Sequence, residues 1–215
     1  MAPPSEINIR NLTGDWVIDK HRTENLDAAL KLQGIGWLRR KAVTSGTITL
    51  KITQFTEEAN ASSLSEAEKP VHLMMQQGLR GIFPGVEQTR VLNWTEHEHV
   101  DAVSGAAIVV RSQFVNGIKA GKGTAKPVIQ IETAGAVDLS SVEAYLASPV
   151  TGGEGEDVLE KAFVQDFIRC EDGGWTAEQV WAVERVGDDV FLSCRAVAVK
   201  GSSIEKACLV YKYEE

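Results

Sequence analysis

Apolar and polar side chains alternate along much of this chain. The clearest example lies at residues 46–55, where Ile48, Leu50 and Ile52 alternate with threonines and a lysine. Because successive side chains of a β-strand point to opposite faces of a sheet, this period of two predicts an antiparallel strand with one buried face.

Further segments alternate in the same way, and turn signals rich in glycine separate many of them. The segments are residues 13–19, 71–80, 86–94, 106–115, 128–132, 162–170, 176–185, 189–199 and 203–213. The turn signals are residues 83–85, 172–174, 187–189 and 201–203. Many short strands joined by tight turns favour an all-β fold, a closed antiparallel up-and-down β-barrel, because closure removes the exposed edges of a flat sheet.

Residues 23–43 show a helical period instead. Thr23 is a candidate N-cap for a first helix, and Gly34 is a candidate stop. The apolar positions are Leu26, Ala29 and Leu30 in the first expected helix and Trp37, Leu38 and Ala42 in the second. We expect a short helix-turn-helix lid over one end of the barrel.

Residues 116–157 interrupt the regular succession of strands. A loop rich in glycine and lysine is followed by the expected strand at 128–132, and then by a helix at 139–147 with Asp138 as its N-cap. A run of glycine and glutamate at 151–156 ends the segment. We interpret it as an insertion at one barrel end, either a lid or a surface loop without a role in binding.

Composition narrows the class of protein. The chain has 215 residues, of which 43% are hydrophobic, and this suits a single domain over residues 1–215. Its net charge of −8 would repel nucleic acid and anionic membranes, so neither is an expected partner. Three widely spaced cysteines, the absence of a signal peptide and the absence of a membrane span predict a cytoplasmic protein with reduced thiols.

Metal and nucleophile signatures are weak. His97 and His99 would share one face of a strand, but a site would need a third ligand such as His72, and a charged strand end or turn explains the pair equally simply. The segment Gly121-Lys122-Gly123 lacks the Ser or Thr of a phosphate loop. We therefore expect no metal and no cofactor.

A basic patch lies on the second expected helix, at Arg39, Arg40 and Lys41. Cations are favoured in the last turn of a helix, so a solvated helix end explains the patch. The alternative is a collar at the cavity mouth that attracts an acidic ligand or a lipid headgroup.

Both ends of the chain resemble cytosolic fatty-acid-binding proteins. The opening Leu-Thr-Gly-Asp-Trp at 12–16, the helical segment that ends in Arg40-Lys41, and the final hairpin strands at 191–194 and 208–211 carry the resemblance. It implies a ten-stranded up-and-down barrel of the lipocalin type, with two short helices, an internal ligand cavity and no cofactor.

The family usually holds the ligand carboxylate with an Arg-x-Tyr pair on the last strand. By this resemblance the tyrosine corresponds to Tyr211, but Leu209 stands at the arginine position. The departure argues against a simple fatty-acid role. We therefore expect an uncharged or weakly acidic, mostly apolar ligand.

The whole chain is similar to a fungal branch of lipocalin-like proteins that are often encoded with natural-product pathways. Asn-Trp-Thr-Glu at 93–96 and the tryptophan-rich segment at 174–181 carry this resemblance. Some such barrels resemble hetero-Diels–Alderases, which join a reactive o-quinone methide to an alkene in tropolone-sesquiterpenoid pathways.

Candidate site residues follow from alternation, once Tyr211 is taken to point inward as its family counterpart does. Each of them could equally be plain core packing. The expected catalytic donors are Tyr211, Trp181 and Gln179. The expected substrate-binding residues are Leu73, Met75, Gln77, Val110, Ser112, Phe114, Val183 and Leu209.

Two functions fit these expectations. A pericyclase would hold two apolar partners in register and aim hydrogen-bond donors at a carbonyl oxygen, so it needs no nucleophile or metal. A carrier without chemistry would use the same cavity for a small hydrophobic ligand. In either case we expect a polyketide-like or terpenoid-like partner, and a homodimer is possible.

Overall fold

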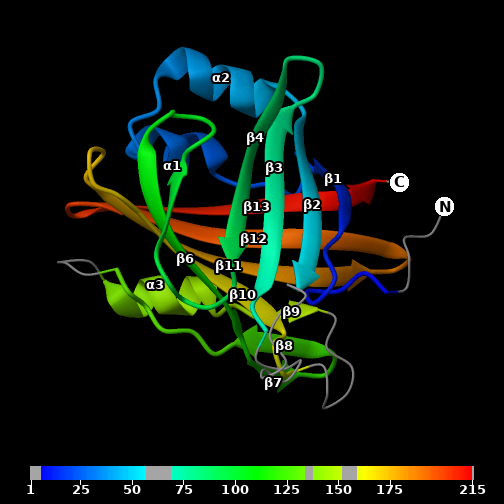
Figure 1. Cartoon of the computed structure of the whole chain (residues 1–215). Helices are drawn as coiled ribbons and strands as arrows, with labels where there is room; N and C mark the ends of the chain where they lie inside the picture. The colour runs from blue at the N-terminus through cyan, green and yellow to red at the C-terminus, as the bar shows by residue number, and fades with distance from the viewer. Residues whose placement is uncertain (1–5, 57–68, 134–137, 152–158, 215) are drawn as a thin grey trace.

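The computed structural model describes residues 6–56, 69–133, 138–151 and 159–214. Within these ranges ten strands form one antiparallel sheet that curls into a nearly closed barrel, in the order β4-β3-β2-β1-β13-β12-β11-β10-β6-β5 (Figure 1). The strands are β1 (Gly14–Ile18), β2 (Ile48–Thr56), β3 (Val71–Leu79), β4 (Phe83–Val91), β5 (His97–Val100), β6 (Ala107–Val115), β10 (Phe163–Cys170), β11 (Trp175–Val186), β12 (Asp189–Lys200) and β13 (Ser203–Glu214). The predicted fold class is confirmed.

The alternation that predicted the barrel is also the pattern of its burial. On β2, Ile48, Leu50 and Ile52 are 3%, 2% and 1% exposed and point into the core, while the polar residues between them face outward. Removing such side chains from water is the main favourable term that holds the strands together.

Two helices cover one end of the barrel, as predicted (Figure 1). They are α1 (Leu26–Leu32) and α2 (Trp37–Ser45). Thr23 is not the N-cap: Asn25 takes that position with a left-handed backbone, and the Thr23 hydroxyl accepts from the Val210 amide at 3.1 Å. Gly34, with φ of 85°, follows the end of α1, because its missing side chain permits the left-handed turn.

The second helix buries less than its apolar residues suggest. Only Val43 of α2 is buried, whereas Trp37 and Leu38 are 64% and 74% exposed. The reason is that α2 crosses the open end of the barrel, so in the described part of the chain the side chains on its outer face have no other element to pack against.

The segment at 83–85 is not the predicted turn. The chain reverses one step earlier, and β4 begins at Phe83. Gly85 has φ of 98° at a bulge between β3 and β4, and a Cβ on Gly78 would lie 2.6 Å from the Phe83 carbonyl oxygen. These glycines permit a close approach of two backbones within the sheet.

The backbone hydrogen-bond ladder is incomplete between β4 and its neighbours β5 and β6. A single parallel bridge joins Leu92 to Ser112, and the Trp94 amide donates to the Ser112 carbonyl at 2.8 Å. We call this region the seam. The segment at 97–100, for which the sequence left open either a strand or a strand end or turn, forms the strand β5 and pairs with β6 beside it.

The insertion forms a second, smaller layer. It contains β7 (Gly117–Gly121), β8 (Thr124–Pro127), β9 (Val150–Thr151) and α3 (Leu139–Leu146). The expected loop at 117–123 is therefore a hairpin, whereas the strand expected at 128–132 is irregular. Asp138 is the N-cap of α3, as predicted, and accepts from the Ser141 amide at 3.1 Å. The expected run at 151–156 lies mostly outside the described residues.

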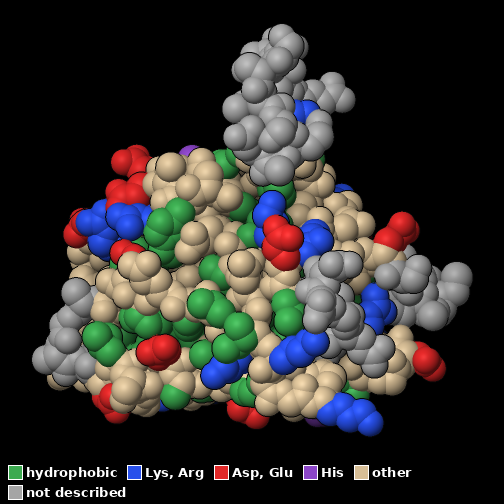
Figure 2. All heavy atoms as spheres, turned by 90° about the horizontal axis from the view of Figure 1, so that it is seen from below, with side chains coloured by type: hydrophobic (Ala, Val, Ile, Leu, Met, Phe, Trp, Pro, Cys, Tyr) green, Lys and Arg blue, Asp and Glu red, His purple; other side chains and the backbone are tan. Residues whose placement is uncertain are grey.

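This layer packs on the outer face of the barrel wall, below it in Figure 1. Val142 and Leu146 of α3, both 0% exposed, belong to the same apolar cluster as Val180 of β11 and Val197 of β12. Figure 2 views this end and shows small groups of hydrophobic side chains among charges of both signs. The described part of the insertion thus covers a wall of the barrel, not the open end where a lid would lie.

Candidate ligand-binding cavity

A cavity of about 140 Å³ lies inside the barrel beneath α1. Its walls come from α1, the strands β2 to β4, the strand β6 and the strands β10 to β13, together with the turn between β5 and β6. It is lined by Leu26, Ala29, Leu30, Gln33, Leu50, Met75, Gln77, Val86, Gln88, Arg90, Asp101, Ala102, Val103, Ile108, Ile168, Trp175, Gln179, Trp181, Cys194, Ala196, Ala207, Leu209 and Tyr211. The lining is mostly apolar with a few polar groups, as is typical of small-molecule sites.

A second hollow of about 350 Å³ lies at the mouth, between α2 and the turns of the strands. It shares Gln77, Ala102 and Val103 with the inner cavity, so the two hollows adjoin one another. Val43 and Phe83 supply apolar surface at the entrance. The outer hollow therefore lies next to α2 on the side of the inner cavity that a ligand from solvent would meet first.

The basic patch on α2 holds the mouth together. The Arg39 guanidinium donates to the Ser104 carbonyl oxygen at 2.9 Å, which ties α2 to the turn between β5 and β6. Arg40 contacts the Asp27 carboxylate at 3.2 Å and so links α2 to α1. These two arginines thus fix the position of α2, whereas Lys41 is exposed and makes no hydrogen bond or ion pair within the described part of the chain.

The structure brings six of the expected site residues together at the cavity wall. They are Met75, Gln77, Gln179, Trp181, Leu209 and Tyr211. The remaining five point inward as expected but pack away from the hollow. Leu73, Phe114 and Val183 belong to the main core, Val110 belongs to a second apolar cluster, and Ser112 is engaged in a buried hydrogen bond.

A buried ion pair crosses the seam beside the cavity. Arg90 of β4 pairs with Asp166 of β10, whose side chain is 0% exposed. The same carboxylate accepts from the Ser112 hydroxyl at 2.6 Å and from the Trp181 indole nitrogen at 2.7 Å. The Arg90 guanidinium also lies over the Trp181 ring, 5.9 Å from its centroid. A buried carboxylate needs such partners, because an unpaired charge in a dry interior is costly.

Sequence reasoning missed both members of this pair. Their signals were present: Arg90 follows Val86 and Gln88 at a spacing of two, and Asp166 interrupts an apolar strand. On β3 and β4, Leu73 lies opposite Arg90, so both side chains share the inner face.

The expected donors differ in whether their hydrogen-bonding groups remain free to contact a ligand. The Trp181 N–H is already given to Asp166, so it is not available to a ligand. Tyr211 is 1% exposed and stacks near Trp181 with ring centroids 6.4 Å apart, and its hydroxyl makes no hydrogen bond within the described part of the chain. The side-chain oxygen of Gln179 is buried without a partner there.

Burial keeps a phenol and a thiol of the cavity wall protonated. It raises the pKa of the Tyr211 phenol and of the Cys194 thiol well above their usual values. Both groups therefore meet a ligand in uncharged form at neutral pH.

The histidines do not gather into one site. His97 and His99 lie on β5, whereas His72 stacks on Phe55 with centroids 5.1 Å apart. Burial and then the nearby Arg90 lower the pKa of His99. Among the described residues no three His, Cys, Asp or Glu side chains are placed to hold a metal ion.

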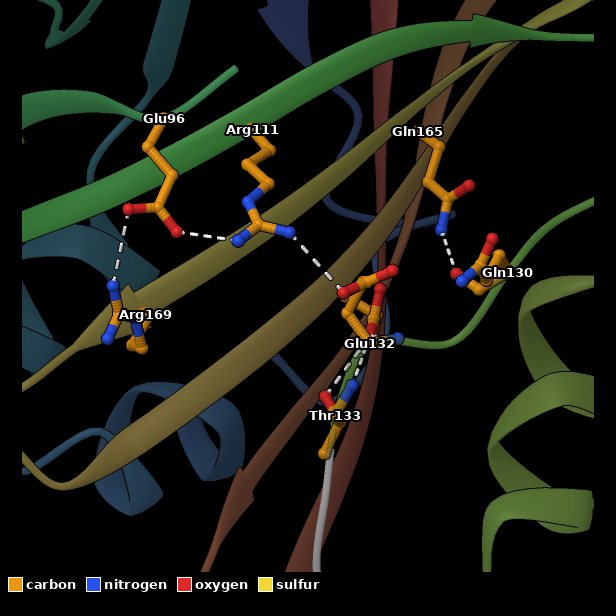
Figure 3. Close-up of polar contacts among 8 residues, drawn as sticks. Glu96, Arg111, Gln130, Glu132, Thr133, Gln165 and Arg169 are labelled. Atoms are coloured by element: carbon orange, nitrogen blue, oxygen red, sulfur yellow. Dashed lines mark hydrogen bonds and ion pairs between the residues drawn. The ribbon is translucent and has the colours of Figure 1, made fainter. Parts of the chain in front are cut away.

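A different polar cluster fixes the insertion to the outer wall (Figure 3). The Glu178 carboxylate, 0% exposed, accepts from the amides of Glu132 and Thr133 at 2.7 and 2.8 Å. Gln165 donates to the Gln130 carbonyl oxygen beside it. Figure 3 also shows Arg111 reaching from Glu96 to Glu132. This cluster lies on the opposite face of β11 from the cavity.

No protein-family model matches this chain, and no curated protein does. Among solved structures, secretory abundant heat soluble protein 4 from Ramazzottius varieornatus is 13% identical, with 98% of this chain and 100% of that chain covered and a TM-score of 0.50. A Schistosoma mansoni fatty-acid-binding protein in complex with arachidonic acid is 12% identical over 94% and 96% of the two chains, with a TM-score of 0.48. The Manduca sexta fatty-acid-binding protein is 15% identical over 94% and 98%, with a TM-score of 0.47.

At such identities the likeness concerns the fold alone. In the described part of the chain, no helix has the length and apolar character to span a membrane. The strand order, the two helices at one end and the nearly closed antiparallel sheet together identify the fold as a barrel of the fatty-acid-binding-protein and lipocalin type.

Proposed function

We propose that this barrel binds a small, largely apolar and uncharged molecule that enters past α2. The observation that carries the proposal is a pair of adjoining hollows, one at an apolar mouth and one inside the barrel beside the unengaged Tyr211 hydroxyl. Apolar walls supply affinity by removing ligand surface from water, and a few polar groups fix its orientation.

The polar groups point to the class of ligand. Leu209 and Met75 offer no charge, and the one cation on the inner lining, Arg90, is neutralised by Asp166. Tyr211 and Gln179 remain able to hydrogen-bond a carbonyl or hydroxyl group. A neutral terpenoid or polyketide with one such oxygen fits this chemistry.

Calorimetric titration with farnesol, a neutral sesquiterpene alcohol, tests the proposal. We expect Ala196→Phe, which places a ring in the cavity, to abolish the binding heat. The matched control is Ala107→Phe on the exposed outer face of β6, which should bind as the parent does. Equal binding by both variants would place the ligand elsewhere.

Catalysis of a hetero-Diels–Alder reaction is the second candidate. It is favoured by one observation, that the Tyr211 hydroxyl lies unengaged among apolar walls, where a donor can stabilise charge that develops on a carbonyl oxygen. Incubation with a generated o-quinone methide and a sesquiterpene alkene, followed by chiral analysis, tests it. Racemic product at the uncatalysed rate leaves the carrier as the function.

A further inference from the structure

We propose that Asp166 determines which ligands the cavity accepts. By neutralising Arg90 it excludes carboxylate anions, and removing its charge converts the barrel into a binder of such anions. The inference rests on the proposed function, because it concerns the selectivity of the same cavity.

The geometry isolates the pair from water. The side chains of Arg90 and Asp166 are 11% and 0% exposed. Arg90 stays protonated at any ordinary pH, so its charge must be met by an anion. In this structure the protein supplies that anion from β10, directly across the seam.

The other titratable groups around the pair contribute no compensating charge. Burial raises the pKa of Cys194 and Tyr211, and burial together with Arg90 lowers the pKa of His99, so all three are neutral near pH 7. Asp101 lines the cavity nearer the mouth and accepts from the Ser104 amide at 2.6 Å. An incoming carboxylate therefore passes Arg39 and Asp101 near the mouth and meets a neutral pair inside.

The guanidinium retains unused hydrogen-bonding capacity. The Arg90 Nε atom is buried and has no hydrogen-bond partner among the described residues. If Asp166 loses its charge, the cation is left without an anion beside a cavity that it already lines. A ligand carboxylate is then the group that relieves the uncompensated charge.

Farnesol and farnesoic acid, which differ only in the terminal group, test the inference by calorimetry at neutral pH. The parent is expected to bind farnesol more tightly than the farnesoate anion. Asp166→Asn is expected to bind farnesoate about tenfold to a hundredfold more tightly than the parent does, the range of a charge-assisted hydrogen bond. The control is the double variant R90Q/D166N, which has lost both charges and should show no gain.

Thermal unfolding gives a second measurement. Farnesoate should raise the melting temperature of Asp166→Asn more than that of the parent, because at a given ligand concentration a tighter ligand stabilises the folded state more. Asp166→Ser, which leaves more room for the carboxylate, is tested in parallel, with refolding in the presence of farnesoate.

The outcomes separate this inference from the proposed function. If the parent binds farnesol but neither Asp166 variant gains affinity for farnesoate or refolds better with it, the inference is overturned and the proposed function stands. A gain that persists in R90Q/D166N also overturns it, since Arg90 would not be the partner. If the parent binds neither compound, the proposed function fails, while a gain in Asp166→Asn alone would still support the inference.

Discussion

Two carboxylates are fully buried on opposite sides of the barrel wall, and the protein compensates them differently. Asp166, on the inner side, has a cation, Arg90, together with two neutral donors. Glu178, on the outer side, has backbone amides and a hydroxyl of the insertion but no cation in the described structure. Burial accordingly raises the pKa of Glu178. The inner site keeps a charge pair next to a ligand cavity, whereas the outer site holds a segment of chain in place.

The comparison predicts the largest effect for Arg90→Met. This change leaves the Asp166 carboxylate buried without its cation, which should lower the free energy of unfolding by about 3 to 5 kcal/mol. The matched control is Arg80→Met, because Arg80 pairs with Glu214 where both side chains are more than 40% exposed. Exposed pairs contribute about 1 kcal/mol or less. Urea denaturation of both variants measures the difference. Equal losses of unfolding free energy would contradict the view that the buried pair matters more for stability than the exposed pair.

Glu178→Ala should have an intermediate effect. It leaves the amides of Glu132 and Thr133 without their acceptor and should cost about 1 to 3 kcal/mol. The loss should also release the segment at 129–133, so protease cleavage there should accelerate while farnesol binding is unchanged. Loss of farnesol binding with an intact insertion would show that the two sides of the wall are coupled.

The effect of Tyr211→Phe should be smaller and should concern ligand binding only. The hydroxyl has no partner in the described structure, so its removal should leave the melting temperature nearly unchanged and weaken ligand binding by about 1 kcal/mol. If the barrel is a catalyst, turnover should fall as well. Tyr213→Phe, on the same strand but outside the cavity lining, is the control. Unchanged affinity and rate in Tyr211→Phe would make the residue structural.

The smallest expected effect is that of Glu178→Gln on the pH dependence of stability. A carboxyl whose pKa is raised by folding binds more protons in the folded state, so its contribution to stability is full at low pH and declines as pH rises from about 4.5 through the raised value. Glu178→Gln removes this decline. The difference in unfolding free energy between variant and parent should therefore grow in favour of the variant across that range, as denaturation at several pH values can measure. A constant difference would mean that Glu178 titrates normally.

Local patterns were sufficient to predict most of the barrel. The alternation of Ile48, Leu50 and Ile52 and the capping residue Asp138 depend on neighbours in the sequence, and both predictions are confirmed. The segment at 83–85 was mistaken for a turn because Pro and Gly also occur at bulges, where the cause is a contact with a distant backbone, here that of Gln77. The segment at 128–132 alternates like a strand but finds no partner strand.

The candidate site was predictable only in part. The resemblance to fatty-acid-binding proteins supplied the inward direction of Tyr211, and alternation grouped the residues that share a face with Trp181. Neither says which inward residues leave a hollow between them. The Arg90–Asp166 pair joins residues that are 76 positions apart across the seam, and such a pairing depends on how far the barrel closes. No local pattern contains that information.

The seam has a further consequence for how the barrel moves. The other neighbouring strands of the sheet are joined by hydrogen-bonded ladders, whereas a single backbone bridge joins the end of β4 to β6, and the Arg90–Asp166 pair joins β4 to β10 beyond it. Amide hydrogens along this line should exchange with solvent sooner than those between β11 and β12, since fewer contacts must break to free them. The barrel would then widen beside the ligand cavity by separation of β4 from β5 and β6. The opposite wall, which the insertion covers, would stay rigid.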